Sequence, residues 1–415
     1  MLKHSIKRLL SNKPFFIAEQ IEAFFLEITM KKTDSNSLIW SCFLLLFILL
    51  NACNNSHHFK NKEKPLTTLA LHHAKGFEVK YYVGYTIISI KEAWKGSNNT
   101  INYVMIQDST SVPTNLLNTA IILPFDLDRI AGISTTYISF LELLEVDDRL
   151  KAISDIKYVC SPKMNAAFNK GEVKEIGFDV NLNMEELIDL QCDALFTYAI
   201  DNSAGPMIQK MKDKKQNPVF VSEYLEETPL AQAEWIKFFG AIFHKEARAD
   251  SIFNVIEKKY LALQAAVIKL PKPTVISNLP YKGNWHVPGG KSVGANFIKD
   301  AGAKYVLDTI PESGGVPLSF ETVYASSANA DFFINVNANN SLAEVVNEFP
   351  EIVNFKSFKE KKIYNNNKRI NANEIGNDYW ESGVPRPDLV LQDLIHIFHP
   401  ELSSDQTLYF YKKIE

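Results

Sequence analysis

The middle of the chain carries an uninterrupted helical pattern between Pro229 and Leu270. This stretch has no internal proline and one glycine, Gly240, and its Ala, Glu, Lys and Phe residues recur at three- and four-residue spacing, which is typical of one or two helices. Pro271 and Pro273 end it, because proline cannot continue a helix. Short apolar strands alternate with helical segments on both sides, the pattern of parallel sheets covered by helices. The sequence therefore predicts an α/β protein of two lobes joined by a helical spine.

The predicted elements place an N-terminal α/β lobe at 76–228, the spine at 229–270 and a C-terminal α/β lobe at 271–415. In the N-terminal lobe, strand composition predicts an antiparallel entry and then parallel strands. These strands are Phe77–Val83, Tyr85–Ile90 and Ile101–Ile106, then Arg129–Ile133, Ala194–Tyr198 and Val219–Val221. The C-terminal lobe is predicted to contain a strand over Thr274–Leu279, a helix over Val293–Ala301, a strand over Asp331–Val336 and a helix from about Pro387 to Phe398.

An export signal is expected at the front of the chain. An apolar run over Leu38–Leu50 follows a charged start at Met30, and it is shorter than the roughly 20 residues that span a bilayer. Leu50-Asn-Ala-Cys53 comes next and resembles a bacterial lipobox. We expect 1–52 to be a signal region with translation starting at Met30, Cys53 to be lipidated, and 53–75 to be a flexible tether. The alternative is an ordinary signal peptide in which Cys53 has no role.

Charge and cysteine content exclude several classes of protein. Forty-four Lys and Arg residues against 48 Asp and Glu residues give a net charge of −4, so we expect no nucleic-acid partner. Cys42 lies in the signal region, which leaves Cys160 and Cys192 as the cysteines that could pair in an exported protein. Buried free thiols are the commoner outcome for such residues, and the pairing stays open.

A short pattern occurs once in each lobe. Asn183 and Ser319 each stand where a helix is expected to begin, and a glutamate follows two positions later, Glu185 and Glu321 respectively. Each helix leads into a buried strand that starts with aspartate. The two halves are therefore predicted to be structurally equivalent.

These features together resemble the substrate-binding proteins of ABC importers for iron complexes, haem and cobalamin. The resemblance runs from about Arg129 to Glu401 and implies class III architecture, with two Rossmann-like lobes joined by one long rigid helix. It rests on Arg129-Ile-Ala-Gly-Ile-Ser134, Ile176-Gly177, Asn183-x-Glu185, Thr228-Pro-Leu-Ala-Gln-Ala-Glu-Trp235, Ala301-Gly-Ala-Lys-Tyr305 and His399-Pro-Glu401.

The resemblance also implies partners. In that family one surface glutamate on each lobe docks into arginine pockets of the two permease subunits, and the corresponding residues here are Glu185 and Glu321. Arginine can hold a carboxylate through two parallel hydrogen bonds. The alternative is that each acid only complements a helix dipole. The expected partners are an inner-membrane ABC permease dimer with its ATPase, a metal-chelate ligand, and the membrane through Cys53. The protein is expected to be a periplasmic monomer.

Ligands of parallel α/β sheets bind beyond the carboxyl ends of the strands. Aromatic and polar side chains follow those ends here and could stack on a bulky ligand and bind its periphery. The predicted ligand-binding residues are Thr135, Thr136, Tyr137, Tyr198, Tyr281, Trp285, Tyr379 and Trp380, with Ser134, Glu223, Tyr224, His286, Asn335 and Asn337 at the same strand ends. For any one aromatic residue, packing in a core is the alternative.

A ferric siderophore is the first choice of ligand, then haem, then a corrinoid. Haem would need an axial ligand, for which His286 and Tyr281 lie on a suitable loop. Corrinoid-binding relatives carry an aromatic residue before each docking helix, and the aligned Asp179 and Gly315 are not aromatic.

Two other classes of function are less well supported by the sequence. A bare transition-metal site is not predicted, because no histidine lies between His73 and His244 to supply ligands from the first lobe. An enzyme is not predicted either. Gly290-Lys291-Ser292 resembles part of a phosphate-binding loop, but Trp285 stands where that motif needs glycine. A periplasmic tetrapyrrole chelatase remains an alternative by analogy of fold.

Overall fold

The computed structural model describes residues 64–97, 99–178, 181–200, 209, 211, 213–214, 216–281, 284–402 and 407–415. The chain divides into two units, Met1–Lys64 and Pro65–Glu415. The expected signal region, Cys53 and the tether up to residue 63 lie outside the described residues, as does Asp179. Among the described helices, none combines the length and the apolar character needed to cross a bilayer.

The second unit begins with a five-stranded sheet. Its strands lie in the order β1 (Thr67–Thr68), β2 (Phe77–Tyr82), β3 (Tyr85–Ile90), β4 (Ile101–Ile106) and β5 (Ile121–Pro124), with α4 (Thr114–Thr119) before β5. All neighbours are antiparallel except β4 and β5. The predicted antiparallel entry is therefore confirmed.

The ordered part of this unit starts earlier than the expected lobe boundary at residue 76. The backbone N–H groups of His72, His73 and Ala74 donate to the buried carboxylate of Glu234, at 2.7–3.1 Å. Residues 67–74 thus belong to the fold, although the sequence analysis assigned them to the tether.

The N-terminal lobe contains a second sheet whose strands are all parallel. Its order is β10 (Pro218–Phe220), β9 (Ala194–Thr197), β6 (Ile130–Gly132), β7 (Leu150–Ile153) and β8 (Lys174–Glu175). The helices of this lobe are α5 (Thr135–Leu144), α6 (Pro162–Asn169) and α7 (Met184–Asp189). Asn183 caps α7, because its side chain accepts from the N–H of Glu186 at 3.1 Å. The predicted strands at β6, β9 and β10 are confirmed.

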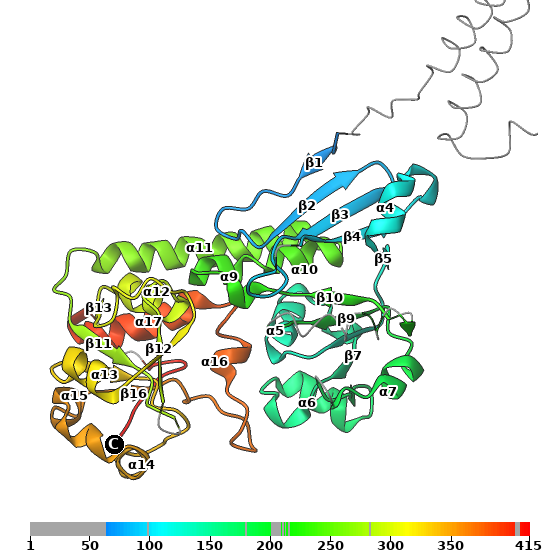
Figure 1. Cartoon of the computed structure of the whole chain (residues 1–415). Coiled ribbons are helices and arrows are strands. Elements are labelled where there is room, and N and C mark those ends of the chain that lie inside the picture. Colours follow the sequence, from blue (N-terminus) through cyan, green and yellow to red (C-terminus); the bar gives the residue numbers. More distant parts are fainter. Residues whose placement is uncertain are drawn as a thin grey trace, which may run out of the picture. The chain divides into compact units, whose positions relative to one another are not determined.

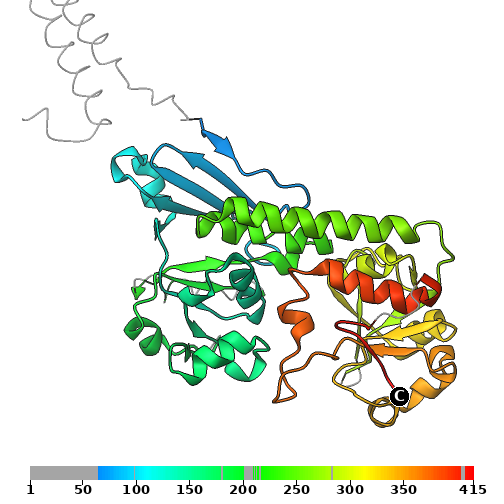
Figure 2. The same ribbon diagram turned by 180° about the vertical axis from the view of Figure 1, so that it is seen from behind.

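Three helices occupy the predicted spine, where one or two were expected. They are α9 (Pro229–Ala233), α10 (Ile236–Ile242) and α11 (Glu246–Val267). A Cβ atom on Gly240 would lie 2.6 Å from the Cβ of Ala249, so glycine is what lets α10 pack closely on α11. At 1.5 Å per residue α11 is about 33 Å long. Figure 2 shows it passing over both lobes beside α17 (Pro387–Phe398).

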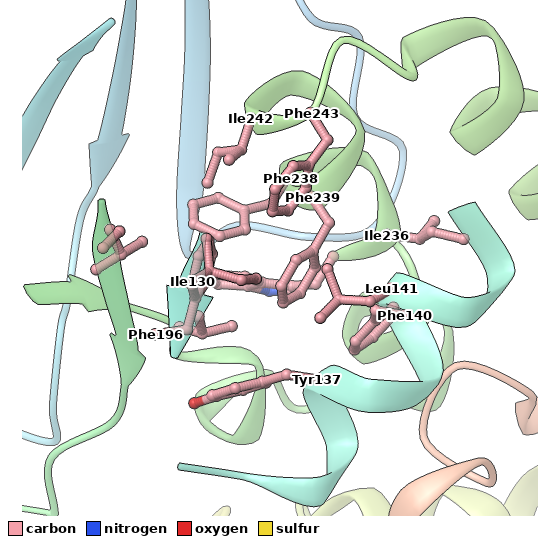
Figure 3. Close-up of a cluster of buried hydrophobic side chains, with 14 of the residues drawn as sticks. Ile130, Tyr137, Phe140, Leu141, Phe196, Ile236, Phe238, Phe239, Ile242 and Phe243 are labelled. Atoms are coloured by element: carbon pink, nitrogen blue, oxygen red, sulfur yellow. The ribbon is translucent and has the colours of Figure 1, made fainter. Parts of the chain in front are cut away.

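Aromatic packing fixes this spine to the N-terminal lobe. Every residue of α10 is buried. The ring of Phe239 stacks on those of Phe140 in α5 and Phe196 in β9, with centroids 5.1 and 5.7 Å apart. Figure 3 shows these rings meeting between α5, α10 and the sheet. Each such pair stabilises the fold by about 0.5–1.5 kcal/mol beyond the stabilisation that comes from burying its surface area. These contacts therefore fix α10 to the N-terminal lobe.

The C-terminal lobe repeats the plan with a different strand order. Its sheet runs β13 (Lys304–Tyr305), β11 (Thr274–Ser277), β15 (Phe332–Ile334), β16 (Ile363–Asn365) and β17 (Lys412–Lys413), and only β17 is antiparallel. A two-stranded sheet of β12 (Trp285–Pro288) and β14 (Gly315–Leu318) lies apart from it. The other helices are α12 (Val293–Asp300), α13 (Phe320–Ser327), α14 (Leu342–Glu348), α15 (Lys356–Lys359) and α16 (Asp378–Glu381).

The predicted equivalence of the two halves holds for part of each lobe. Helix α7 leads into β9 and helix α13 leads into β15, and each of these strands pairs with the first strand of its own sheet, β6 or β11. The remaining strands differ, because the first strand is central in the N-terminal sheet and next to the edge in the C-terminal one. The two lobes therefore match at the helix–strand pair and not throughout.

Candidate ligand-binding cleft

A cavity of about 590 Å³ lies where the carboxyl ends of the two parallel sheets face each other. This volume is within the range of small-molecule sites. The lining residues come from loops that follow the strands of both lobes. They are Ile133, Ser134, Thr135, Ser154, Tyr158, Phe178 and Tyr198 from the N-terminal lobe, and Asn278, Asn335, Asn337, Ala338, Asn340, Asn366, Asn367, Ile370, Glu374, Ile375, Gly376, Asn377 and Trp380 from the C-terminal part.

Strand order explains why the cavity forms at this place. In open α/β sheets, a crevice opens where the chain connections turn to opposite sides of the sheet. That reversal lies between β6 and β9 in one lobe and between β11 and β15 in the other. Residues following all four strands line the cavity: Thr135, Tyr198, Asn278 and Asn335. The two crevices face each other and make one site.

The wall from the C-terminal lobe is built of asparagines held by one another. Asn365 is fully buried, and its side chain accepts from the N–H of Val336 at 3.1 Å and donates to the carbonyls of Asn337 and Asn339 at 3.0 and 2.9 Å. The side chains of Asn337 and Asn339 each donate to Glu348, at 2.6 Å. These bonds fix the loops after β15 and β16 in one arrangement before any ligand binds.

Several backbone positions at this wall are in the left-handed region. Asn278, Asn335, Asn337 and Glu374 have φ values of 68°, 60°, 53° and 59°, and all four line the cavity. Asparagine tolerates this region better than most residues, because its short side chain can bond to nearby backbone. Such conformations gather at functional sites when the surrounding contacts hold them, as the asparagine network does here.

An interlobe segment, residues 369–381, crosses from the C-terminal lobe to the N-terminal lobe. It folds back on itself through a bridge between Ile370 and Asn377 and an Arg369–Asp378 ion pair of 2.5 Å. It ends in α16, which Figure 1 shows between the lobes. Six of its residues, Ile370, Glu374–Asn377 and Trp380, line the cavity, so this segment forms part of the site.

Hydrogen bonds tie the interlobe segment to the N-terminal lobe. The buried carboxylate of Glu381 accepts from the N–H groups of Cys160 and Ser161, both at 2.7 Å. Thr136 donates its hydroxyl to the carbonyl of Trp380 at 2.8 Å, and Asn371 donates to the carbonyl of Lys157 at 2.7 Å. Each of these hydrogen bonds joins a side chain on one side to a backbone group on the other. Together they position Trp380 at the cavity.

Two buried carboxyl groups close to the cleft titrate abnormally. Burial raises the pKa of Glu381 to about 7, although the two N–H donors act in the opposite direction. Burial likewise raises the pKa of Glu223 to about 8. The Oε2 atom of Glu223 and the hydroxyl of Tyr137 are buried without a hydrogen-bond partner among the described residues. Glu223 is therefore protonated at neutral pH.

The structure brings only some of the predicted ligand-binding residues to the cavity. Thr135, Tyr198 and Trp380 line it, as do Ser134, Asn335 and Asn337. Thr136 and Tyr379 support it from behind: Thr136 through its bond to Trp380, and Tyr379 through ring contacts to Trp380 and Tyr411. The side chain of Tyr137 is buried in the core of the N-terminal lobe.

Trp285 and Tyr281 do not line this cavity, contrary to the expectation. Trp285 is 1% exposed, and its ring lies among Phe320, Phe333, Phe349 and Phe355. Both residues border a separate pocket of about 420 Å³ on the C-terminal lobe. Glu223, Tyr224 and His286 are also absent from the lining that the structure describes. His286 and Tyr281 are thus not placed to act as axial ligands of a haem in the cavity.

Five of the seven asparagines that line the cavity were not predicted from the sequence. They are Asn278, Asn340, Asn366, Asn367 and Asn377. The sequence did contain a signal, because asparagines crowd the end of the strand predicted over Asp331–Val336, at 335–340, and recur at 365–367. Amides gathered at carboxyl ends of parallel strands are expected to share one edge of the sheet.

Gly290-Lys291-Ser292 has a structural explanation. A Cβ atom on Gly290 would lie 2.2 Å from the carbonyl oxygen of Asp308, so the backbones approach more closely than another residue allows. Ser292 caps α12 by accepting from the N–H of Ala295 at 3.2 Å. Gly290 thus serves packing and Ser292 serves capping, the requirements that also produce glycine and serine before other helices.

The two glutamates predicted to dock lie on the surface. Glu185 and Glu321 are exposed in the first turns of α7 and α13. The N–H of Glu321 itself and the hydroxyl of Ser319 lower the pKa of the Glu321 carboxyl, so it is charged at neutral pH. Each acid thus stands at the equivalent point of its lobe.

The described cysteines do not form a disulfide. Cys160 and Cys192 are free thiols, and burial raises their pKa values to about 12 and 11. No cluster of three or more His, Cys, Asp or Glu side chains suited to a metal ion occurs in the described part of the chain.

The sequence pattern of the periplasmic binding protein family matches residues 130–369, which is more than half of the chain. The chain belongs to the periplasmic binding protein family. An uncharacterized lipoprotein of Methanocaldococcus jannaschii is 25% identical over 296 residues, 69% of each chain. An uncharacterized protein of the same organism is 22% identical over 76% of this chain and 98% of its own.

Solved structures show the fold of this periplasmic binding protein to be the class III type. One is a periplasmic binding protein from Veillonella parvula, with a TM-score of 0.54 and 18% identity over 76% of this chain and 98% of the other. A periplasmic haem-binding protein from Pseudomonas aeruginosa has a TM-score of 0.52 and 15% identity over 70% and 98%. A structure from Saccharomonospora viridis, described as an ABC-type Fe³⁺-hydroxamate transport system, has a TM-score of 0.51 and 15% identity over 66% and 94%. The predicted two-lobe α/β fold is thereby confirmed.

Proposed function

We propose that this protein is the solute-binding lipoprotein of an ABC importer and captures a metal chelate, with a ferric siderophore as the first choice. The observation that carries the proposal is the cavity between the two parallel sheets, open at the reversal of strand order in both lobes. A carrier needs a site of this kind, because contact with both lobes couples ligand binding to their arrangement.

The side chains at the cavity support a bulky ligand with a polar periphery. Tyr158, Phe178, Tyr198 and Trp380 offer flat apolar faces, and asparagine, serine and threonine groups surround them. Aromatic rings contribute large contact areas, while the amide groups set orientation. Haem is the second candidate, because Tyr158 and Tyr198 could supply the phenolate oxygen that haem iron accepts.

Delivery to a permease is proposed to use Glu185 and Glu321. Their support is exposure at equivalent helix–strand pairs in the two lobes. Two acidic contacts of this kind, one from each lobe, would orient the protein on a transporter with two similar subunits.

Anchoring at Cys53 is proposed for the periplasmic side of a membrane. The support is the lipobox-like Leu50–Cys53 and a relative described as a lipoprotein. Incorporation of a labelled fatty acid into the full chain, and its loss in Cys53→Ser, tests the anchor. Equal labelling of both chains would contradict it.

The function is tested by native mass spectrometry and absorbance spectra of the full chain with ferric siderophores, haem and corrinoids. The proposal predicts a one-to-one complex with at least one ferric siderophore, which Trp380→Ala weakens. Binding of haem with a shifted Soret band, and of no siderophore, would favour the second candidate. Failure of every chelate to bind would contradict the proposed function.

A further inference from the structure

The described lining of the cavity is almost without charged side chains. Seven asparagines line the cavity: Asn278, Asn335, Asn337, Asn340, Asn366, Asn367 and Asn377. Among the described lining residues, Glu374 is the one with a full charge, and it is negative. Lysine, arginine and histidine do not occur in that described lining.

Basic groups close to the cleft are already engaged. Lys157 forms an ion pair with Asp155 at 2.5 Å, and Arg369 pairs with Asp378 at 2.5 Å. Lys412 donates to the side chain of Asn340 at 2.7 Å. Lys157 and Arg369 are therefore each neutralised by a carboxylate, whereas Lys412 is bonded to a neutral amide and lies outside the described lining.

The seven asparagines of the lining, which form the asparagine wall, cannot neutralise the charge of an anion. A carboxylate or catecholate that leaves water needs charge-assisted partners to recover its hydration. Neutral amides provide dipoles only, and here many of their N–H groups already donate to protein acceptors such as Glu348, Ser277 and the carbonyl of Asn339. The carboxylate of Glu374 at the rim would repel an anion further.

The wall does have capacity for neutral hydrogen bonds. Asn367 is 4% exposed, and its Oδ1 atom has no hydrogen-bond partner among the described residues. Its Nδ2 atom donates to the carbonyl of Asn339 and the side chain of Asn340, at 3.2 and 3.1 Å, and this fixes the amide plane. A buried acceptor without a partner costs roughly 1–3 kcal/mol, so this part of the wall favours hydrogen-bond donors over further acceptors such as anionic oxygens.

We infer that the cavity selects metal chelates without net negative charge, such as ferric tris-hydroxamates, and discriminates against catecholate and carboxylate-bearing complexes. The inference rests on the proposed function. Three hydroxamates carry one negative charge each and neutralise Fe³⁺, whereas three catecholates carry two each and leave the complex strongly negative. Haem keeps two propionates. An uncharged complex loses little hydration at an amide wall and stacks on Trp380.

The test compares ligands of different charge on the full chain. Fluorescence quenching titrations use ferrichrome, an uncharged ferric tris-hydroxamate; cyanocobalamin, an uncharged corrinoid; ferric enterobactin, a tris-catecholate; and haem. The expected result is that an uncharged complex binds at least tenfold more tightly than ferric enterobactin and haem, about the discrimination that 1.4 kcal/mol gives.

A charge reversal at the rim sharpens the test. Glu374 is exposed and lies at a φ that Lys361 also adopts, so Glu374→Lys should fold. This variant should bind ferric enterobactin roughly tenfold more tightly than wild type, with the gain reduced at high salt, and its gain for uncharged ferrichrome should be smaller. Glu312→Lys, an exposed site of the same lobe outside the described lining, is the control and should change neither affinity.

The outcomes separate the two proposals. Tighter binding of the anionic complexes by the wild-type chain, with no effect of Glu374→Lys, would overturn the charge inference and leave the proposed function standing. Absence of binding for all four complexes would overturn the proposed function and the inference with it.

Discussion

Two tryptophans that were both predicted to bind ligand, Trp285 and Trp380, have different environments. Trp285 is 1% exposed inside an aromatic core and donates through Nε1 to the carbonyl of Asn278 at 2.8 Å. Trp380 is 59% exposed and lines the cavity. The first ring therefore contributes to stability, and the second has its large apolar surface available to a ligand.

Paired substitutions should separate these roles. Trp285→Ala should lower the free energy of unfolding by about 3–5 kcal/mol, the usual cost of removing a buried large aromatic side chain. Trp380→Ala should change it by less than about 1 kcal/mol and weaken chelate binding at least tenfold. Urea unfolding and ligand titration measure the two effects. Equal losses of stability would contradict the assignment.

Glu223 gives a pH prediction. Its pKa is raised from 4.5 to about 8, so between these values the folded state keeps a proton that the unfolded state releases. The contribution of Glu223 to the free energy of unfolding is therefore greatest below pH 4.5 and falls as the pH rises to 8. Glu223→Gln, which mimics the protonated acid, should be more stable than wild type at pH 8 and similar at pH 5. At about 1.4 kcal/mol per pH unit, the gain cannot exceed about 5 kcal/mol.

Urea unfolding of both chains at pH 5 and pH 8 checks this prediction. Exposed Glu172→Gln is the control, and it should leave the pH dependence unchanged. A wild-type chain and a Glu223→Gln chain with parallel pH profiles would show that Glu223 ionises normally.

At the residue scale, sequence reasoning identified positions near the ends of strands and misjudged side-chain direction. Thr135, Tyr198 and Trp380 were placed at the cavity correctly. Trp285 was not, although Trp285 and Val287 are buried while His286 between them is exposed. This alternation is typical of a strand with one face in a core, and it is the signal that predicts Trp285 to point inward.

At the element scale, the interlobe segment is the feature that links the lobes at the site. The side chain of Asn371 donates to the carbonyls of Lys157 and Val159 at 2.7 and 3.2 Å and accepts from the N–H of Gly376 at 3.0 Å. One side chain thus shapes the segment and attaches it to the other lobe.

Asn371→Ala should release this segment. The change removes hydrogen bonds to four backbone groups, the carbonyls of Lys157 and Val159 and the N–H groups of Ile375 and Gly376. It should lower the free energy of unfolding by about 1–3 kcal/mol. Amide hydrogen exchange should quicken at residues 369–381 and at Cys160 and Ser161, and chelate affinity should fall because Trp380 is no longer held. Asn354→Ala, an exposed site on the same lobe, is the control. Unchanged exchange in both regions would contradict the proposed attachment.

Long, regular elements and short strands that are buried throughout, such as β6, β9 and β10, could be predicted, whereas several other short elements could not. The helix expected over Pro387–Phe398 has those bounds in the structure, because Pro387 starts it and its apolar residues keep a helical period. Strands β7, β8, β12 and β14 and helix α16 were missed. Each has two to four residues, too few to show a period, and tertiary hydrogen bonds rather than local propensity define them.

At the scale of the molecule, α11 and the interlobe segment both connect the lobes. Lys259 of α11 pairs with Asp388 of α17 at 3.2 Å, and Tyr260 bonds to Asp300 of α12 at 2.7 Å, so the spine is attached to the C-terminal lobe as well. With α10 fixed to the N-terminal lobe, we expect small lobe movement on binding and affinity that comes from a preformed cleft.

Permease docking is a property of both lobes together. Glu185→Ala combined with Glu321→Ala should abolish chelate uptake by cells and leave the affinity of the purified protein intact, because both residues are exposed and outside the cavity lining. The matched control is Glu172→Ala with Glu351→Ala, which removes one exposed acid from each lobe elsewhere. Normal uptake by cells with the Glu185→Ala and Glu321→Ala double variant would contradict the docking role. Loss of chelate affinity in that purified variant would contradict it as well.

Crystals of the full chain grown with a bound ferric chelate, measured at the iron absorption edge, locate the cargo directly. The account predicts a single anomalous iron peak in the cleft, between Tyr198 on one side and Asn335 and Trp380 on the other. An iron peak at the pocket beside Trp285, or on the outer surface of either lobe, would contradict it.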